Sequence, residues 1–248
     1  MTLQEFFEKN PKVAIAFSGG VDSAYLLYVA KKYANEVKAY YVKSQFQPQF
    51  ELEDAKRLAG ELGADMAVLS LNVLEVSKVM ENPAERCYYC KKAIMGSIGA
   101  AASADGFDVL LDGTNASDDA SERPGMRALA ELSVLSPLRE CGLTKSQVRE
   151  LSKEAGLFTW DKPAYACLAT RIPTGEVITE GKLAATEKAE DYLFSLGFTD
   201  FRVRSKDGHA CLQVCEAQLP LLIKYRKDIL VKLKDDYKTV SLDLEVRG

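Results

Sequence analysis

The sequence predicts an α/β protein, with a parallel β-sheet covered by helices on both faces and a small C-terminal α/β domain. Short apolar runs alternate with amphipathic helical stretches along residues 12–113. This strand–helix alternation is typical of parallel sheets whose two faces are both covered. Near Pro173 the pattern changes to shorter strands in which apolar and polar residues alternate. We therefore expect two domains, 1–172 and 173–248.

Each element of the first domain is predicted from its own residues. The strands are runs of apolar β-formers, and the helices have apolar residues at helical spacing. In chain order, the predicted elements are a strand at 12–18, a helix at 23–33, a strand at 36–42, a helix at 50–62, a strand at 64–71, a helix at 88–103 and a strand at 107–113. Ligands bind such sheets beyond the carboxyl ends of the strands. The segments 18–23, 43–47 and 113–119 are therefore the expected site.

The second domain is predicted to contain a small sheet with antiparallel pairing and two helices. In order, its elements are a helix at 180–196, a strand at 201–205, a turn at 206–208, a strand at 209–214, a helix at 217–235 and a strand at 239–246. The alternation in FRVRS places Phe201 and Val203 on one face and projects Arg202 and Arg204 together from the other. These arginines form either a solvated strand face or a phosphate clamp, because guanidinium groups match phosphate oxygens.

Composition argues against several classes of protein. The chain has 248 residues, 47% of them hydrophobic, and its net charge of −4 provides no general field that would attract nucleic acid. No apolar stretch approaches the roughly 20 residues that cross a bilayer, and the first residues lack the pattern of a signal peptide. Six cysteines without signs of secretion favour metal binding or catalysis over a disulfide framework. We expect a cytoplasmic protein whose partner is neither a membrane nor a nucleic acid.

The segment SGGVDS, residues 18–23, joins the first predicted strand to the first predicted helix. Gly19 and Gly20 permit a tight turn and the close approach of a ligand, and the helix N-terminus offers free N–H groups and a positive dipole. We expect an anion to bind here, although a glycine-rich turn without a ligand is the alternative. The segment is neither a Walker A motif nor GxGxxG. It resembles the SGGxDS signature of the PP-loop ATP pyrophosphatases, which cleave ATP between its α- and β-phosphates.

This resemblance implies a Rossmann-like PP-loop fold that binds ATP and Mg²⁺. The residues that it places around the pyrophosphate are Ser18, Gly19, Gly20, Asp22 and Ser23. Asp22 would contact Mg²⁺, which is needed because main-chain dipoles alone do not neutralise the phosphate charge. Lys43 and Ser44 would lie near the adenosine, and Thr114 and Asn115 would contact nucleotide or phosphate. An ordinary turn rich in Asn and Asp, in which Asp118 and Asp119 are solvated, is the alternative interpretation of the last segment.

Three of the cysteines form a second candidate site. Cys87 and Cys90 are three residues apart, so their sulfurs face one way if the segment is helical or a turn. Cys167 lies far away in the sequence, where nearby Lys162 and Arg171 would lower its thiol pKa if they point inward. Three thiolates leave one metal position unfilled, which favours a 4Fe-4S cluster with an open iron.

Other interpretations of these cysteines stay open. A CxxC pair also occurs in redox and zinc sites, and Cys141 would complete the four ligands of a zinc site. Cys167 alone is also compatible with a small buried apolar residue. No role is assigned to the remaining candidates, Cys211, Cys215, Trp160 and His209.

Further motifs extend the resemblance to almost the whole chain. They are DGTNASDD, RPGMRALAELSVLSPL, LTKSQVRELSKEAGL, DKPAYACLATRIPTGE and the Arg202/Arg204 pair. Together they resemble the LarE family, ATP-dependent sulfur transferases that make the nickel-pincer nucleotide of lactate racemase. The resemblance implies that ATP adenylates a carboxylate of pyridinium-3,5-biscarboxylic acid mononucleotide, which then becomes a thiocarboxylate. It also implies that Arg202 and Arg204 bind the phosphate of this substrate and that the chain forms a homo-oligomer, a hexamer.

The resemblance implies one of two sulfur donors. In the sacrificial form, the cysteine matching Cys167 forms a thioester with the adenylated substrate and loses its sulfur, leaving dehydroalanine. In the catalytic form, this cysteine and a CxxC pair hold a 4Fe-4S cluster whose open iron carries the sulfide. Because the chain also has Cys87 and Cys90, we predict the cluster-dependent form. The alternative functions are a tRNA-thiolating PP-loop enzyme, an amide-forming synthetase and a nucleotide-binding sensor without turnover.

Overall fold

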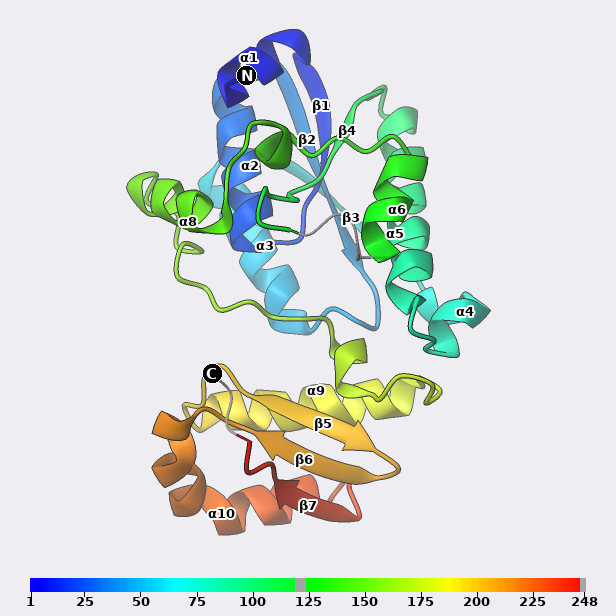
Figure 1. The fold of residues 1–248 in the computed structure, drawn as a ribbon, viewed down its shortest axis with the longest axis vertical. Helices are drawn as coiled ribbons and strands as arrows, with labels where there is room; N and C mark the ends of the chain where they lie inside the picture. Colours follow the sequence, from blue (N-terminus) through cyan, green and yellow to red (C-terminus); the bar gives the residue numbers. More distant parts are fainter. Residues whose placement is uncertain (119–123, 246–248) are drawn as a thin grey trace. The chain divides into compact units, whose positions relative to one another are not determined.

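The computed structural model describes residues 1–118 and 124–245, which divide into two compact units (Figure 1). Unit 1 consists of Met1–Val79 and Glu85–Ala164, and unit 2 consists of Met80–Ala84 and the chain from Tyr165 onward. Each unit has its own buried apolar side chains. The predicted domains 1–172 and 173–248 remain a prediction, because compactness alone does not show which segments fold separately.

Unit 1 is built on a four-stranded parallel sheet, which confirms the predicted fold class. Its strands are β1 (Lys12–Ala16), β2 (Glu36–Lys43), β3 (Asp65–Ser70) and β4 (Leu110–Leu111), in the order β3-β2-β1-β4. β1 lies in the interior of the sheet, where Ile15 pairs with Ala39 on one side and Leu111 on the other. Four of its five residues are buried, as expected for a strand covered on both faces. β4 is shorter than the predicted strand at 107–113.

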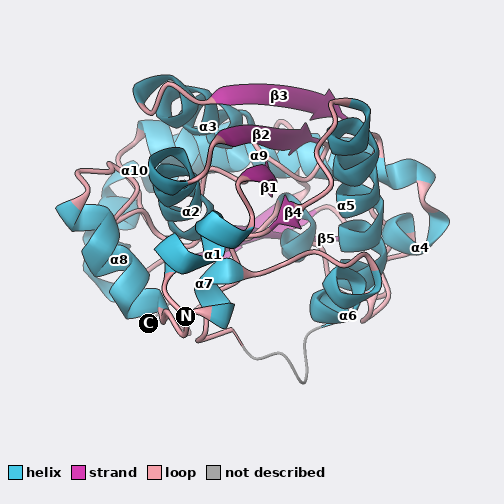
Figure 2. Ribbon diagram, turned by 90° about the horizontal axis from the view of Figure 1, so that it is seen from above, coloured by secondary structure: helices cyan, strands magenta, loops and turns pink. Residues whose placement is uncertain are grey.

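Helices cover both faces of this sheet (Figure 2). They are α1 (Leu3–Lys9), α2 (Val21–Tyr33), α3 (Gln49–Glu61), α4 (Ser77–Met80), α5 (Arg86–Ala104), α6 (Pro124–Glu131), α7 (Pro137–Glu140) and α8 (Lys145–Glu154). Val13 and Ile15 of β1 belong to a core that also contains residues of α1, α2, α3, α7 and α8, whereas Ala14 and Ala16 belong to a second core with residues of α5 and α6. Because successive side chains of a strand point to opposite faces, β1 contributes residues to the apolar core on each side of the sheet.

Unit 2 contains a three-stranded sheet in the order β5-β6-β7. Its strands are β5 (Arg202–Lys206), β6 (His209–Gln213) and β7 (Thr239–Leu242), and its helices are α9 (Glu180–Ser195) and α10 (Leu219–Leu233). β5 and β6 are antiparallel, as predicted. β6 and β7 are parallel, so the predicted antiparallel pairing is wrong for this pair. The reason is α10, which returns the chain to the same end of the sheet before β7 begins.

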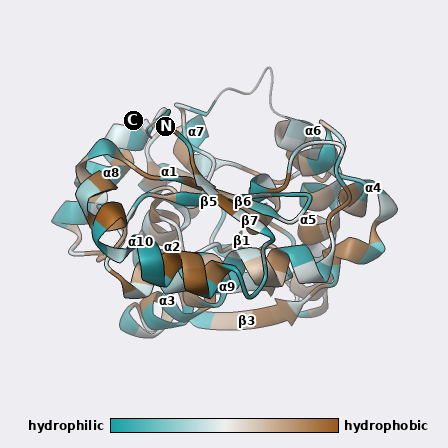
Figure 3. Ribbon diagram, turned by 90° about the horizontal axis from the view of Figure 1, so that it is seen from below, coloured by the Kyte–Doolittle hydropathy of each residue, from teal (hydrophilic) through white to brown (hydrophobic). Residues whose placement is uncertain are grey.

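The helices of unit 2 bury apolar residues against this sheet. Leu193 of α9 and Leu222 of α10 belong to one core together with Val203 and Leu212 from the strands. Both hydrophilic and hydrophobic residues occur along α9 (Figure 3), and its buried residues recur at helical spacing and share one face: Leu183, Thr186, Ala189, Glu190 and Leu193. In the described part of the chain, no helix is long and apolar enough to span a membrane.

Candidate functional site

A cavity of about 480 Å³ opens in unit 1 beyond the carboxyl ends of β1 and β4. Its walls come from the segment after β1, the start of α2, the segment after β4, and the facing parts of α5 and α6. The lining residues with polar side chains are Ser18, Asp22, Ser23, Cys87, Lys91, Asp112, Thr114 and Asp118. Their position is the one that the parallel sheet predicts for a ligand site.

The SGGVDS turn at the base of the cavity is held by its own side chains. Gly19 has φ +73°, and a Cβ built on it would lie 3.1 Å from the Cβ of Ala55 in α3, so this position requires glycine. The main-chain N–H of Ser18 donates to Ser23 Oγ at 3.2 Å, and the two serine hydroxyls are 3.0 Å apart. Ser23 Oγ also donates to the Gly20 carbonyl at 3.2 Å.

The start of α2 offers the cavity its main-chain N–H groups. Gly20 is the N-cap and supplies no side-chain hydrogen bond to the first turn of this 13-residue helix. The amides at a helix start are therefore left for a ligand, and the helix dipole favours an anion. Because Ser18, Gly20 and Ser23 also line the cavity, this geometry fits a phosphate group.

The segment after β4 meets the start of α2 at Gly113. A Cβ built on Gly113 would lie 2.8 Å from the main-chain N of Ser23, closer than real side chains approach. The neighbouring Asp112 is buried and accepts hydrogen bonds from the main-chain N of Thr114 at 3.1 Å, from Thr114 Oγ1 at 2.6 Å and from Ser136 Oγ at 2.7 Å. Lys91 of α5 forms an ion pair with it at 3.2 Å. Asp112 begins the DGTNASDD motif, but neither it nor Lys91 is assigned a role from the sequence; Asp112 fixes Thr114 at the cavity.

Both carboxylate oxygens of Asp22 have partners. Oδ1 accepts a hydrogen bond from Asn115 Nδ2 at 3.2 Å, and Oδ2 lies 2.5 Å from the ammonium of Lys145. The structure thus brings two predicted site residues, Asp22 and Asn115, into contact. Lys145 lies in the LTKSQVRELSKEAGL motif, but nothing in the motif alone indicates that it pairs with Asp22.

Lys43 and Ser44 lie at the end of β2, beside β1, but outside the residues that line the cavity. The ammonium of Lys43 donates to the Gln47 carbonyl. The main-chain N and the hydroxyl of Ser44 donate to Gln47 Oε1 at 3.1 and 2.7 Å. Contact with adenosine therefore stays a prediction for these two residues.

The oxygen donors at the cavity fit Mg²⁺. Asp22 and Asp118 both contribute carboxylates to its lining, whereas Asp119 lies outside the described residues. Mg²⁺ commonly binds to one or two carboxylates and completes its coordination with water and substrate phosphates. A protein site with this role does not need a preformed set of three or more ligands.

The paired cysteines lie on α5, with Cys87 exposed and Cys90 partly buried. Residues three apart on a helix are neighbours on its surface, as predicted for this pair. Cys87 lines the cavity together with Ser18 and Asp22. Cys167 belongs to unit 2. Within residues 1–118 and 124–245, no group of three or more His, Cys, Asp or Glu residues is arranged to hold a metal ion, so the three-cysteine cluster stays a prediction.

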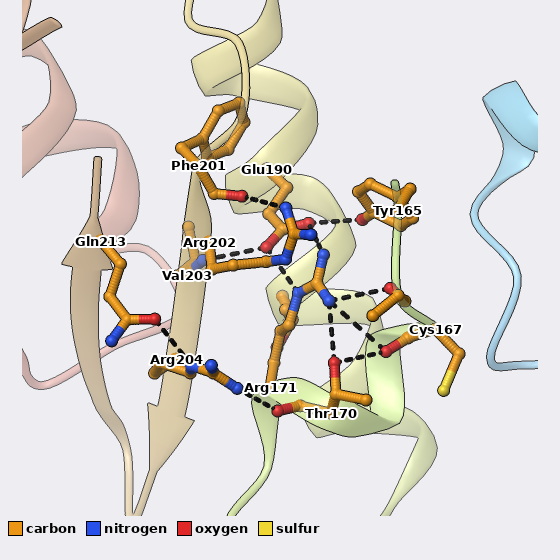
Figure 4. A network of polar contacts seen from close by, with 12 residues as sticks. Tyr165, Cys167, Thr170, Arg171, Glu190, Phe201, Arg202, Val203, Arg204 and Gln213 are labelled. Atoms are coloured by element: carbon orange, nitrogen blue, oxygen red, sulfur yellow. Dashed lines mark hydrogen bonds and ion pairs between the residues drawn. The ribbon is translucent and has the colours of Figure 1, made fainter. Parts of the chain in front are cut away.

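A buried ion pair fixes the segment around Cys167 (Figure 4). Arg171 and Glu190 are fully buried, and two hydrogen bonds of 2.8 and 2.9 Å join the guanidinium to the carboxylate. Glu190 also accepts from the hydroxyl of Tyr165 and from the main-chain N of Val203. Burial is the largest single effect and lowers the pKa of the Arg171 guanidinium, but the hydrogen bonds and charge of Glu190, together with the interactions with Tyr165 and Cys167, outweigh it, so this pKa is raised.

The guanidinium of Arg171 contacts the main chain beside Cys167. Its Nη1 donates to the carbonyl of Ala166 at 2.8 Å and to that of Cys167 at 3.5 Å. The Cys167 sulfur points away from the guanidinium (Figure 4). Arg171 therefore fixes the backbone of the cysteine, and its predicted effect on the Cys167 thiol stays a prediction. Lys162 belongs to unit 1, where its ammonium pairs with Asp54 at 2.7 Å.

Arg202 and Arg204 of β5 both reach the segment around Cys167, but to different depths. Arg202 is buried, donates to the Phe201 carbonyl at 2.6 Å and lies 5.4 Å from the centre of the Tyr165 ring. Arg204 is exposed and donates to Gln213 Oε1 and to the Thr170 carbonyl. Arg202 and Arg204 therefore project from the same face of β5, as the alternation predicts. Of these two side chains, only that of Arg204 is exposed.

The residues without an assigned role have structural surroundings. The ring nitrogens of His209 lie 2.6 Å from Thr239 Oγ1 and 2.9 Å from Ser241 Oγ, which ties β6 to β7. Burial raises the pKa of the Cys141 thiol. A raised thiol pKa keeps a cysteine protonated and a poor nucleophile.

We predict that Gly113→Ala weakens ATP binding. The added methyl group must displace the start of α2, because it would meet the main chain of Ser23. Overpacking of this kind typically costs about 1–3 kcal/mol, so ATP affinity should fall by about five- to 150-fold in calorimetric titration. Gly99→Ala in α5 is the control, since nothing lies within 4 Å of its added Cβ. Equal ATP affinity in both variants would show that the contact does not position the turn.

We predict that Glu190→Gln destabilises unit 2 strongly. The change leaves the buried Arg171 charge without its carboxylate partner, and breaking a buried ion pair typically costs about 3–5 kcal/mol. Chemical denaturation followed by circular dichroism measures the loss. Asp191→Asn removes a carboxylate from an exposed position next along α9 and should cost little. Similar small losses in both variants would contradict the role of the ion pair.

Comparison with known proteins bears on the identity of this site. The family described as queuosine biosynthesis protein QueC matches residues 12–82, which contain the SGGVDS turn. A protein of Synechocystis described only as uncharacterized is 36% identical over 224 residues, 90% of this chain and 83% of that protein. The tRNA-specific 2-thiouridylase MnmA of Thermotoga sp. is 26% identical and covers 79% of this chain.

A further relative shows the family over the whole chain. It is the pyridinium-3,5-bisthiocarboxylic acid mononucleotide synthase of Lactiplantibacillus plantarum, 32% identical over 246 residues. The alignment covers 98% of this chain and 89% of that enzyme, so it includes both the cavity of unit 1 and the Cys167 segment of unit 2. The chain therefore belongs to the LarE family of ATP-dependent sulfur transferases, within the PP-loop ATP pyrophosphatases.

Proposed function

We propose that this enzyme adenylates a carboxylate of pyridinium-3,5-biscarboxylic acid mononucleotide and converts it to a thiocarboxylate. The observation that carries the proposal is that the SGGVDS turn and the thiol of Cys87 line one cavity. The expected phosphate site and a cysteine therefore line the same cavity in unit 1. The relative from Lactiplantibacillus plantarum, whose name specifies the dithiolated product, supports the choice of substrate.

In the first step, the substrate carboxylate attacks the α-phosphorus of ATP, and the bond to the bridging oxygen of pyrophosphate breaks. The N–H groups at the start of α2 would hold the departing pyrophosphate, where the helix dipole favours its charge. Asp22 would bind Mg²⁺, which neutralises phosphate charge. Thr114, fixed by Asp112, would contact the nucleotide from the segment after β4.

In the second step, sulfur attacks the acyl carbon and AMP leaves. The proposal assigns sulfur delivery to a 4Fe-4S cluster held by Cys87, Cys90 and Cys167. Such a cluster would have one iron without a cysteine ligand, which can carry sulfide. The position of Cys87 on the cavity lining supports this route, and Cys90 lies on the same side of α5.

Sacrificial transfer from Cys167 is the alternative route. Here the Cys167 thiolate attacks the acyl carbon, AMP leaves, and the resulting thioester loses its cysteine Cα–H and Cβ–S bonds to give thiocarboxylate and dehydroalanine. The firm fixation of the Cys167 backbone by Arg171 and Thr170 suits this route too. The two routes differ in whether Cys87 and iron are needed.

Arg202 and Arg204 are proposed to bind the phosphate of the mononucleotide. Their contacts with Tyr165 and Thr170 support this role, because they lie beside the segment that carries Cys167. The exposed Arg204 would make the first contact. Arg202, largely buried, would orient the local chain and add positive charge.

The proposal includes assembly into a homo-oligomer, a hexamer by family resemblance. Exposed apolar residues on α10 support an interface between copies of the chain. Ile223, Leu230 and Val231 are exposed by 65%, 41% and 73%. Apolar residues grouped on one helix of a small unit are typical of a surface that becomes covered.

We predict that Cys87→Ser removes both iron and repeated turnover. The protein is purified without air, its iron is measured, and it is incubated with ATP, Mg²⁺ and the biscarboxylated nucleotide before mass spectrometry of protein and product. The wild type should contain iron, form more than one thiocarboxylate per chain and keep its mass. Cys211→Ser is the control, because this partly buried cysteine lies on β6 and belongs to neither motif.

A different outcome identifies the sacrificial route. Iron-free wild-type protein that makes one thiocarboxylate per chain and loses the mass of one H₂S would contradict the cluster proposal. In that case Cys87→Ser should retain activity, whereas Cys167→Ser should lose it.

Thiolation of tRNA is the second candidate function, favoured by the similarity to the thiouridylase of Thermotoga sp.. Its substrate is a polyanion, and binding of a polyanion depends on a basic surface and weakens with salt. The chain has a net charge of −4. We expect no retention of tRNA at micromolar protein and low salt in a gel-shift assay; retention that is lost on adding salt would favour this candidate instead.

A further inference from the structure

The ion pair between Asp22 and Lys145 carries an inference about when metal enters the site. We propose that the ammonium of Lys145 occupies, in the nucleotide-free enzyme, the place at Asp22 that a divalent cation takes with nucleotide. Metal would then bind together with nucleotide and not before it. This inference rests on the proposed function in one respect, the use of Asp22 as a metal ligand.

Each oxygen of the Asp22 carboxylate already has a partner. Oδ2 lies 2.5 Å from Lys145 Nζ, and Oδ1 accepts a hydrogen bond from Asn115 at 3.2 Å. The Asp22 side chain is only 21% exposed, so water compensates its charge incompletely. A lysine ammonium is a compact point charge and so supplies at this carboxylate what a metal cation would supply. The metal and the ammonium therefore compete for one oxygen.

Lys145 has an unusual position in its helix. It is the first residue of α8, where the helix dipole is positive and a cation is unfavourable. The first turn of α8 contains no acidic residue that would offset this charge locally. The attraction to Asp22, which comes from a helix more than a hundred residues earlier, is thus the stabilising contact of the ammonium.

The main chain of Lys145 is fixed, whereas its side chain can move. Its main-chain N donates to Ser117 Oγ at 3.0 Å, and Leu143 accepts a hydrogen bond from Ala116 at 2.7 Å. Thr144 caps the helix through a reciprocal pair of hydrogen bonds with Gln147. The four-carbon side chain, 36% exposed, can therefore leave Asp22 without any change of fold.

The second ion pair at the cavity, between Asp112 and Lys91, is more buried than the pair between Asp22 and Lys145. Asp112 is 6% exposed and holds Thr114 and Ser136 as well as Lys91, so removing its lysine would disturb several contacts. Asp22 and Lys145 are more exposed, and Asp22 has one other hydrogen-bond donor. Lys145 is thus the cation that can exchange, whereas Lys91 is part of the fixed framework.

The test is Mn²⁺ binding without nucleotide, followed by electron paramagnetic resonance of the free ion. Lys145→Met should bind Mn²⁺ about tenfold more tightly than the wild type, a coupling of ordinary size between two competing ligands. Lys145→Arg keeps the charge and should bind like the wild type. Lys153→Met changes another lysine of α8, which lies over the ring of Trp160, and should also bind like the wild type.

The double variant Lys145→Met with Asp22→Asn locates the metal. It should lose the gained affinity, and retention of the gain would overturn the inference because the ion would then bind elsewhere. Unchanged Mn²⁺ affinity in Lys145→Met, with wild-type circular dichroism, would overturn it as well. Failure of the proposed function shows separately, as the absence of thiocarboxylate from wild-type enzyme supplied with ATP and the mononucleotide.

Discussion

The close approach of Gly113 to the start of α2 is the constraint on which the nucleotide cavity depends. The two segments come from strands β4 and β1, and a Cβ at position 113 would lie 2.8 Å from the main chain of Ser23. This contact leaves room for no side chain. It sets the distance between the two polar segments and allows Asn115 to reach Asp22 from the other wall. Phosphate binding, metal binding and the Lys145 ion pair all presuppose that distance.

In unit 2, a buried ion pair between Arg171 and Glu190 positions the segment around Cys167. This ion pair is fully buried, and an ion pair of this kind contributes more to a defined geometry than to net stability. The Glu190 carboxylate is shared among Arg171, Tyr165 and Val203, which come from the Cys167 segment and from β5. One carboxylate therefore ties the segment that carries Cys167 to the strand that carries Arg202 and Arg204. The sulfur itself is left pointing away from this network (Figure 4).

The sequence predicts most of the fold because its signals are local. Apolar runs mark β1 and β2, and SGGVDS marks the turn, whereas the pairing direction of β7 depends on how α10 returns the chain. The same distinction applies to the site. Alternation places Arg202 and Arg204 on one face of the strand but does not predict that Arg202 is buried and Arg204 exposed. Asp112 contacts Ser136 and Lys91, and Lys145 contacts Asp22; local patterns do not reveal these contacts, because the partners are distant in sequence.

In the proposed reaction, the carboxylate is activated by direct attack on the α-phosphate of ATP. The most direct measurement labels the carboxylates of the mononucleotide with ¹⁸O and follows the label by mass spectrometry after reaction with ATP and Mg²⁺. Adenylation followed by attack of sulfur leaves a carboxylate oxygen on the phosphate of AMP. We expect AMP that carries one ¹⁸O for each thiocarboxylate formed, together with unlabelled pyrophosphate. Unlabelled AMP, or ADP and phosphate as the products, would contradict it.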